Sequence, residues 1–212
     1  MKITWIGHSC FRIEKNGYCI VIDPYTAGSV PGYDPVSLSA NEVLCSHEHG
    51  DHNGRNEVQL VPTDNVVSPF QVDVLDTWHD EVQGAKRGPN KIFLISDGTH
   101  RIAHLGDLGC MLSDSQIESL KNLDVLLIPI GGYYTIDDQQ AAEVITALTP
   151  KHVVPMHFRD DQAGFGYAEI GTSDHFIRRM NSVLSLQTCE VSAAELPDQQ
   201  VIVLQPLRSR HN

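Results

Sequence analysis

Residues 46–52 read Ser-His-Glu-His-Gly-Asp-His, and this stretch decides how the whole chain is interpreted. His47 and His49 are two residues apart, so on extended backbone their side chains point the same way. Glu48 then points the opposite way and is not expected to bind what the histidines bind. The first half of the motif therefore presents two imidazoles on one side of the chain.

The second half of the motif turns the chain. Gly50 permits a sharp bend, and the adjacent Asp51 and His52 can reach one centre only from a turn or a helix start. The segment can therefore offer two groups of ligands to two neighbouring metal positions. Imidazole and carboxylate groups suit zinc, iron or manganese. A polar loop with incidental histidines is the alternative, but four candidate ligands within six residues favour a metal site.

The pattern of apolar residues predicts many strands and few helices. Turn signals at Lys15-Asn16-Gly17 and Asp97-Gly98 predict two hairpins, and residues 24–40 are expected to form a long loop. Helices are expected at Ser113–Leu120, which starts with a capping box, at the amphipathic Asp137–Leu148, and at Ser173–Val183. Strands are expected at Lys2–Gly7, Cys10–Glu14, Tyr18–Asp23, Glu42–Cys45, Val66–Val67, Val72–Leu75, Lys91–Ser96, His100–Leu105, Asp124–Ile130, His152–His157 and Val201–Leu204.

Composition sets limits on the class of protein. With 212 residues and no visible linker, the chain is expected to be a single domain over residues 1–212. Its net charge of −12 argues against nucleic acid and anionic membranes as partners. The sequence has no apolar run long enough to span a membrane and no signal-peptide pattern. Five scattered cysteines without a CxxC pair indicate reduced thiols and a cytoplasmic protein.

Further residues complete a pattern around the histidine motif. Asp23 follows a strand in Val-Ile-Asp-Pro, His79 lies in Thr-Trp-His-Asp, Asp107 in His-Leu-Gly-Asp, and His157 in Val-Pro-Met-His. With the HxHxDH motif, this order resembles the metallo-β-lactamase superfamily. The strings Trp-Ile-Gly-His-Ser (5–9), Gly-Pro-Asn (88–90) and Leu-Leu-Ile-Pro-Ile-Gly-Gly (126–132) resemble its small hydrolases similar to ascorbate-6-phosphate lactonase. Relatives of the N-acyl-phosphatidylethanolamine phospholipase D type also share these features.

The resemblance implies an α/β fold, the four-layer αβ/βα sandwich of two mixed sheets with helices on the outer faces. It also implies two divalent metal ions, zinc first, with manganese or iron as alternatives. One metal would be held by His47, His49 and His79, the other by Asp51, His52 and His157, with Asp107 bridging them. His8, His100 and His104 compete with His79 for its role, which His79 is given because it follows a strand and precedes a Gly-rich loop.

Several residues are assigned to the surroundings of the metals. Asp23 is expected to orient the histidine motif through hydrogen bonds, and His8 and His104 to lie near it. Arg87 suits bidentate binding of an anion, although a solvated loop charge is the alternative. Tyr133, together with Tyr134, is expected at the pocket rim. The resemblance implies histidine at the position of Cys110 in many relatives, and either a pocket position or a buried, inert thiol would fit.

The resemblance implies a metal-dependent hydrolase that uses a hydroxide held by two metals on a small, anionic ester, lactone or phosphoester. Asp51 and Asp107 are the expected catalytic residues. Phospholipase D-like phosphodiesterase activity is one alternative, and a non-catalytic, metal-stabilised binding protein is another. A small-molecule substrate is the expected partner, and assembly into a homo-oligomer is left open.

Overall fold

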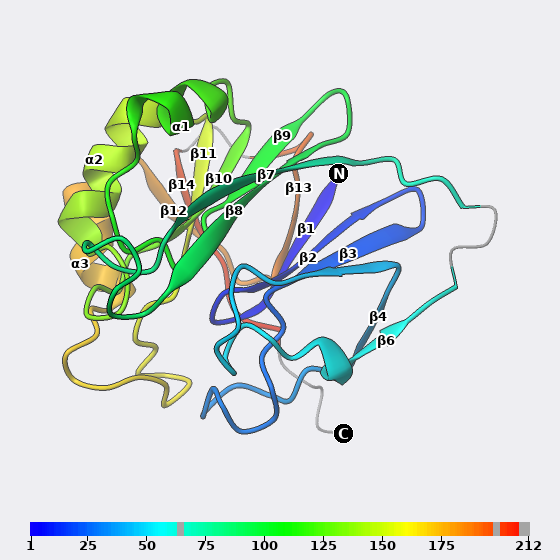
Figure 1. Cartoon of the computed structure of the whole chain (residues 1–212), viewed down its shortest axis with the longest axis horizontal. Helices are drawn as coiled ribbons and strands as arrows, with labels where there is room; N and C mark the ends of the chain where they lie inside the picture. The colour runs from blue at the N-terminus through cyan, green and yellow to red at the C-terminus, as the bar shows by residue number, and fades with distance from the viewer. Residues whose placement is uncertain (63–65, 197–199, 208–212) are drawn as a thin grey trace.

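Two mixed β-sheets face each other in the computed structural model, which describes residues 1–62, 66–196 and 200–207 (Figure 1). The first sheet has five strands in the order β13-β1-β2-β3-β5, and the second has seven in the order β12-β14-β11-β10-β9-β8-β7. The five-stranded sheet consists of β1 (Lys2–Gly7), β2 (Cys10–Lys15), β3 (Tyr18–Ile22), β5 (Glu42–Leu44) and β13 (Glu190–Ser192). The seven-stranded sheet consists of β7 (Gln71–Trp78), β8 (Pro89–Ser96), β9 (Arg101–His104), β10 (Val125–Pro129), β11 (His152–Met156), β12 (Val183–Ser185) and β14 (Val201–Val203).

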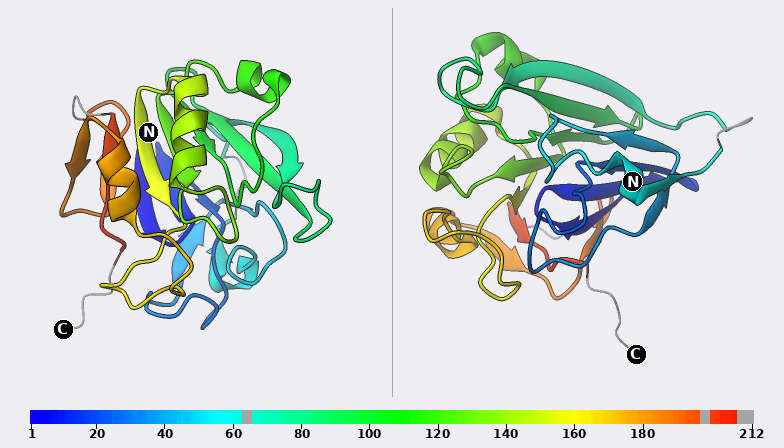
Figure 2. Two further views of the ribbon diagram at one scale, coloured as in Figure 1. Left: turned by 90° about the vertical axis from the view of Figure 1, so that its left-hand side faces the viewer. Right: turned by 60° about the horizontal axis from the view of Figure 1, so that its bottom comes forward.

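The main hydrophobic core lies between the sheets and under the helices. Strand β2 shows the alternation that produces it, because Phe11 and Ile13 belong to this core whereas Cys10 faces the other way. Strand β10 is buried along its whole length, as expected for a strand covered on both faces. Helices α1 (Asp114–Ser119), α2 (Asp138–Leu148) and α3 (Ser173–Arg179) lie together on one side of the molecule and cover the seven-stranded sheet (Figures 1 and 2).

The outer face of the five-stranded sheet is covered differently. A second hydrophobic cluster forms there, in which Cys19 and Val21 of β3 pack with Tyr25, Val36 and Val58. The cover consists of the long connection after β3, a two-stranded sheet of β4 (Leu38–Ala40) and β6 (Val58–Leu60), and the short 3-10 helix η1 (Arg55–Glu57). The αβ/βα sandwich is therefore present, with one of its outer layers reduced to loop, short strands and one helical turn.

Strand directions bring the functional segments to one end of the sandwich. Strands β1, β3 and β5 run in one direction in the first sheet, because β2 is antiparallel to both neighbours and β3 pairs with β5 in parallel. Strands β7, β9, β10 and β11 likewise run together in the second sheet. In α/β sheets, ligands bind beyond the carboxyl ends of such strands.

Most expected elements are confirmed, and three expectations are wrong. Both hairpins form, and α1 and α2 begin with complete capping boxes at Ser113 and Asp137. Residues 66–67 form no strand, and the expected loop 24–40 ends in β4. Helix α3 begins after Thr172 at Ser173 and stops at Arg179, because the chain leaves it to pair as β12 from Val183. None of the helices in the described parts of the chain could cross a membrane.

Candidate metal centre

Five strands deliver the candidate ligands, and a sixth delivers Asp23, to the same end of the sandwich. His8 follows β1, Asp23 follows β3, and residues 46–52 follow β5, whereas His79, Asp107 and His157 follow β7, β9 and β11. Three of these strand ends hold non-glycine residues in left-handed backbone conformations, namely His8 (φ 53°), Asp23 (φ 47°) and His157 (φ 49°). Such conformations are costly and concentrate at functional sites, where the surrounding structure enforces them.

Three imidazoles form the first group of candidate ligands. His47, His49 and His79 each place one ring nitrogen within 4.8 Å of the other two. Their rings meet at centroid distances of 4.6 Å between His47 and His49 and 4.7 Å between His47 and His79. The structure thus brings His79 beside the motif. It places His100 instead on the hairpin turn near Asp97, 3.5 Å from that carboxylate.

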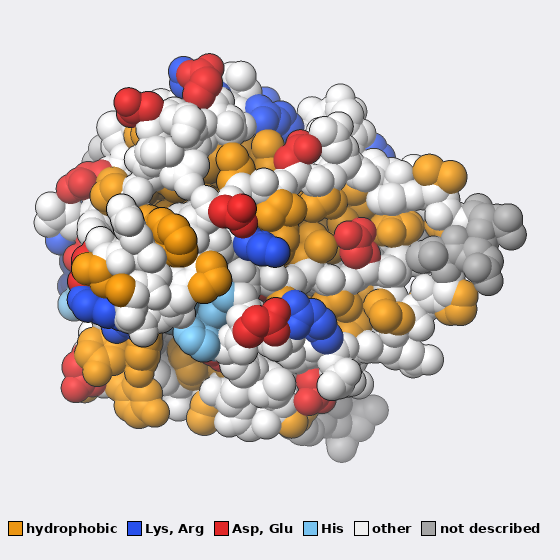
Figure 3. Space-filling model, in the orientation of Figure 1, with side chains coloured by type: hydrophobic (Ala, Val, Ile, Leu, Met, Phe, Trp, Pro, Cys, Tyr) orange, Lys and Arg blue, Asp and Glu red, His pale blue; other side chains and the backbone are white. Residues whose placement is uncertain are grey.

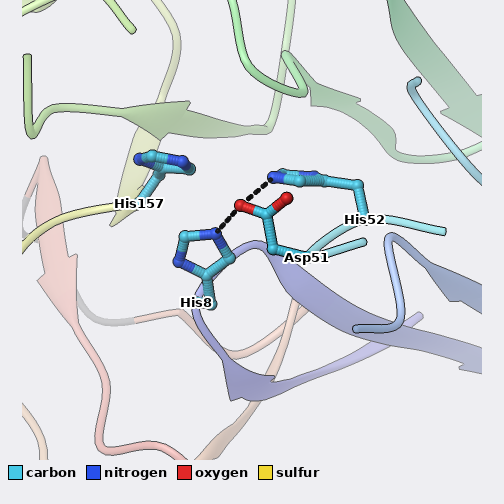
Figure 4. Close-up of side chains that lie close together, drawn as sticks. All are labelled: His8, Asp51, His52 and His157. Atoms are coloured by element: carbon cyan, nitrogen blue, oxygen red, sulfur yellow. Dashed lines mark hydrogen bonds and ion pairs between the residues drawn. The ribbon is translucent and has the colours of Figure 1, made fainter. Parts of the chain in front are cut away.

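The second group combines imidazoles with a carboxylate. His8, Asp51, His52 and His157 each place one donor atom within 4.8 Å of the others (Figure 4). The Asp51 side chain lies between two of the rings, with its Oδ2 3.2 Å from His8 Nε2 and 3.6 Å from His52 Nε2. His8 therefore lies within this group, closer to the centre than a pocket-lining position requires.

Asp107 connects the two groups. Its Oδ2 lies 3.2 Å from His79 Nε2 and also 3.2 Å from His157 Nε2, so one oxygen atom contacts a member of each group. The buried Asn90 fixes this position, since its Oδ1 accepts the Asp107 N–H at 2.9 Å and its Nδ2 donates to Leu105. Gly106 has a φ of +55°, and a Cβ there would lie 2.3 Å from Asn90 Oδ1, so glycine is required at this approach.

Asp23 lies under the motif rather than among the ligands. It is completely buried and accepts hydrogen bonds from Ser46 N and Ser46 Oγ at 2.6 Å each. The same carboxylate contacts His52 Nδ1 at 2.8 Å, which leaves Nε2 of that ring directed toward Asp107. His104 lies on the other side, 4.0 Å from Asp23, and its second ring nitrogen contacts the Ser9 carbonyl oxygen.

Burial and neighbouring charges shift the pKa values of the cluster in different directions. Burial and the neighbouring His52 lower the pKa of His47 to about 3, which favours the neutral imidazole that a metal requires. Burial alone would raise the pKa of Asp107, but His157 and His52 outweigh it and hold that pKa well below its ordinary range. Burial would lower the pKa of His52, yet the carboxylates of Asp107 and Asp23 raise it well above its usual value.

Unpaired donor atoms test whether a metal would fit. His47 Nε2, His52 Nε2 and Asp107 Oδ1 are buried and make no hydrogen bond, although His52 Nε2 and Asp107 Oδ1 lie only 3.1 Å apart. Buried polar atoms normally have partners. Close donor atoms without hydrogen bonds are what a shared cation would leave, and the nitrogen and carboxylate donors suit zinc, iron or manganese. The residues therefore fit a metal centre.

Other sequence-predicted residues lie at the periphery. The Arg87 guanidinium donates to the Tyr133 carbonyl oxygen at 2.9 Å and lies 5.5 Å from the Tyr134 ring centroid. Tyr133 is 56% exposed, and it is the neighbouring Tyr134 that lines the cavity above the centre. Cys110 is half-buried and contacts Thr77 and the Trp78 carbonyl oxygen on β7. The candidate ligand groups do not include it.

Two buried polar residues have structural roles that sequence reasoning missed. In the sequence, Asn90 is recognisable only as part of Gly-Pro-Asn. Its hydrogen bond to Asp107 connects β8 to the segment after β9. Asp80 follows His79 and accepts four backbone N–H groups of the next loop at 2.7–2.9 Å, those of Val82, Gly84, Lys86 and Arg87. The sequence shows an acidic residue directly after the candidate ligand His79, but it does not show which N–H groups this residue binds.

A cavity of about 500 Å³ opens above the second group, with His8, Asp51 and His157 among its lining residues. Histidine side chains reach the surface in the middle of one face, beside hydrophobic side chains (Figure 3). The site therefore combines a buried polar centre with access from solvent, as a hydrolytic centre requires.

Comparison with known proteins places this geometry in a family. Residues 2–157 match the family described as "Beta-lactamase superfamily domain". A "UPF0173 metal-dependent hydrolase" of Desulforamulus reducens is 30% identical in an alignment that covers 74% of this chain and 84% of that protein. A UPF0173 protein of Pyrococcus furiosus is 32% identical in an alignment that covers 74% of this chain and 83% of that protein.

Solved structures agree. A structure from Thermotoga maritima, described as a putative Zn-dependent hydrolase of the metallo-β-lactamase superfamily, has a TM-score of 0.76 and 28% identity, covering 97% of this chain and 99% of that one. The metallo hydrolase Igni18 of Ignicoccus hospitalis has a TM-score of 0.60 at 20% identity, covers 97% and 95% of the two chains, and supports the fold alone. The chain therefore belongs to the metallo-β-lactamase superfamily and is a metal-dependent hydrolase.

Proposed function

We propose that the chain hydrolyses a small ester, lactone or phosphoester at a centre of two divalent metal ions. The observation that carries this proposal is the position of Asp107 Oδ2, 3.2 Å from an imidazole nitrogen of each ligand group. A carboxylate between two groups of donors is the arrangement that bridges two metals. Zinc is the first candidate, supported by the description of the Thermotoga maritima structure.

The chain's own groups would divide the work. His47, His49 and His79 would hold one metal, and Asp51, His52 and His157, with His8 beside them, the other. Bound divalent cations supply a nucleophile from water at neutral pH and stabilise negative charge on a substrate oxygen. Asp51 Oδ2 contacts His8 Nε2 at 3.2 Å and is partly open to the cavity, so it is placed to orient a water and to accept its proton.

Charge and space favour a small substrate. Two divalent cations would outweigh the carboxylates of Asp51 and Asp107, so the centre would attract an ester or phosphoester head although the chain carries a net charge of −12. The cavity of about 500 Å³ lies within the range of small-molecule sites. The net negative charge of the chain disfavours nucleic acid as a substrate. Lactonase-like activity and phospholipase D-like phosphodiesterase activity are both hydrolyses that such a centre could perform.

The test begins with elemental analysis of protein purified without added metal or chelator. About two equivalents of zinc or manganese per chain would support the proposal, and two of iron would favour redox chemistry instead. Less than about half an equivalent that added metal cannot restore would overturn the dinuclear assignment and favour a binding role.

Activity follows on the metal-loaded protein. Lactones, esters and phosphodiesters are then compared for the wild type, Asp107→Asn and the control His175→Ala, which removes an exposed histidine of α3. Hydrolysis that the control retains and Asp107→Asn loses supports the proposal. Equal activity of all three proteins contradicts it.

A further inference from the structure

The walls of the cavity above the centre differ chemically from its floor. The floor holds the candidate metal ligands His8, Asp51 and His157. The walls are mainly aromatic and aliphatic, formed by Pro31, Tyr134, Phe165, Tyr167 and Ile170. A ligand that places its reacting group on the floor would therefore place the rest of its body against apolar surface.

Cations are missing from these walls. Among the described residues that line the cavity, no lysine or arginine occurs. Arg87, which lies beside Tyr134, already donates to the Tyr133 carbonyl oxygen and covers the face of the Tyr134 ring. A phosphate or carboxylate on the body of the substrate would find no lysine or arginine along these walls.

Phe165 is held in place as a preformed wall. Asp160 and Phe165 exchange backbone hydrogen bonds at 3.0 and 3.1 Å, and Asp160 Oδ1 accepts the N–H groups of Gln162 and Ala163. The turn packs so closely on Gly32 that a Cβ there would lie 1.9 Å from the Ala163 oxygen.

The position of the Phe165 ring follows from this turn. Its centroid lies 4.9 Å from that of His8, at an interplanar angle of 67°, and 5.5 Å from that of Tyr33. The Phe165 ring, fixed beside the candidate ligand His8, therefore presents an apolar surface to the substrate without needing to move.

We infer that the substrate carries an uncharged apolar body, an acyl chain or a ring, and that Phe165 and Tyr167 determine this specificity. The inference rests on the proposed hydrolysis. It distinguishes among substrates that the hydrolytic centre alone would accept equally. An alkyl-substituted lactone fits the floor and the walls together. A phosphorylated sugar lactone fits the floor but not the walls.

Three lactones with the same six-membered ring and different substituents test the inference. They are δ-valerolactone, δ-decalactone with its pentyl chain, and 6-phosphoglucono-δ-lactone. Each buried methylene is worth about three- to fourfold in binding. We expect kcat/KM for δ-decalactone to exceed that for δ-valerolactone by at least about tenfold, and the phosphorylated lactone to be the poorest of the three.

Variants of Phe165 and Tyr167 test whether these side chains cause the preference for δ-decalactone. Phe165→Ala should reduce kcat/KM for δ-decalactone about tenfold and leave δ-valerolactone within about twofold. Tyr167→Ala, at a side chain that is 66% exposed and so not needed for folding, should act in the same direction more weakly. Leu60→Ala, equally exposed but outside the cavity lining, is the control. Equal kcat/KM for all three lactones, or a preference for the phosphorylated one, would overturn the inference.

Binding separates this inference from the proposed reaction. Heptanoate and acetate share a carboxylate head, and their affinities for the metal-loaded protein can be measured by calorimetry without any turnover. Tighter binding of heptanoate, by at least about tenfold and diminished in Phe165→Ala, supports the apolar wall even if no lactone is hydrolysed. Lactone hydrolysis with equal binding of both acids would keep the reaction and reject the wall.

Discussion

Two buried aspartates flank the candidate ligands, one on each sheet, and they bind different kinds of partner. Asp23 follows β3 and accepts hydrogen bonds from the Ser46 side chain and backbone, and it contacts the ring of His52 at 2.8 Å. Asp80 follows β7 directly after His79, and within the described part of the chain it accepts hydrogen bonds from four backbone N–H groups of the following loop. The first carboxylate orients the candidate ligand His52, and the second holds the loop that follows the candidate ligand His79. Although the two side chains are similarly buried, their different partners predict different consequences when each is removed.

Replacing Asp107 should have a larger effect than replacing Asp23 or Asp80, because Asp107 itself contacts both candidate ligand groups. Asp107→Asn should abolish turnover of any substrate found, since in the proposed dinuclear centre a neutral amide would be a poor bridge between two cations. The variant keeps the side-chain volume and should retain the fold, as measured by circular dichroism. Metal content and kcat of the purified variant check the expectation. Retained turnover would contradict the bridging role.

Asp23→Ala should have the next largest effect. Loss of a carboxylate that orients a ligand histidine typically weakens metal affinity about 10–100-fold. Competition with a chelator measures this for the metal-loaded protein. His104→Gln, which leaves the Asp23–His52 contact in place, should weaken the affinity less. An Asp23 variant with wild-type affinity would show that the carboxylate serves the fold rather than His52.

The same comparison explains what could be predicted from sequence. The motif of residues 46–52 was recognisable because its ligands are neighbours in the chain, and capping boxes and Asp-Gly turns are equally local signals. The strand ends that bring His79, Asp107 and His157 together are set by the pairing of strands far apart in sequence, so their assignment came from resemblance. Asn90, Asp80 and Phe165 were missed because their roles depend on partners that only the folded chain supplies. Helix α3 was extended too far because pairing of β12 with β14 outweighs local helix propensity.

Asp80→Asn should leave the metal centre largely intact and loosen its neighbour. An amide oxygen can replace only part of the acceptor capacity of a carboxylate that binds four N–H groups. Hydrogen exchange should accelerate at Val82, Gly84, Lys86 and Arg87, whereas metal affinity should fall by less than in Asp23→Ala. Exchange mass spectrometry of both variants provides the comparison. Faster exchange around His52 instead of this loop would reverse the roles of the two aspartates.

The smallest expected effect is a difference between the wild type and Asp80→Asn in how the protection of the loop amides depends on pH. Burial by itself would raise the pKa of Asp80, but the N–H groups of Arg87, Gly84, Lys86 and Val82 outweigh it and lower the pKa to about 2. The lowered pKa stabilises the folded loop at pH values above the ordinary carboxyl value of 3.8, and this contribution is lost as the pH falls toward about 2. Protection of the loop amides in the wild type, relative to Asp80→Asn, should therefore be constant above about pH 5 and shrink on acidification. Because the asparagine does not titrate, the exchange rate in Asp80→Asn divided by that in the wild type isolates the effect of the carboxylate at each pH. A ratio that grows in acid would show that Asp80 is not the group that holds the loop.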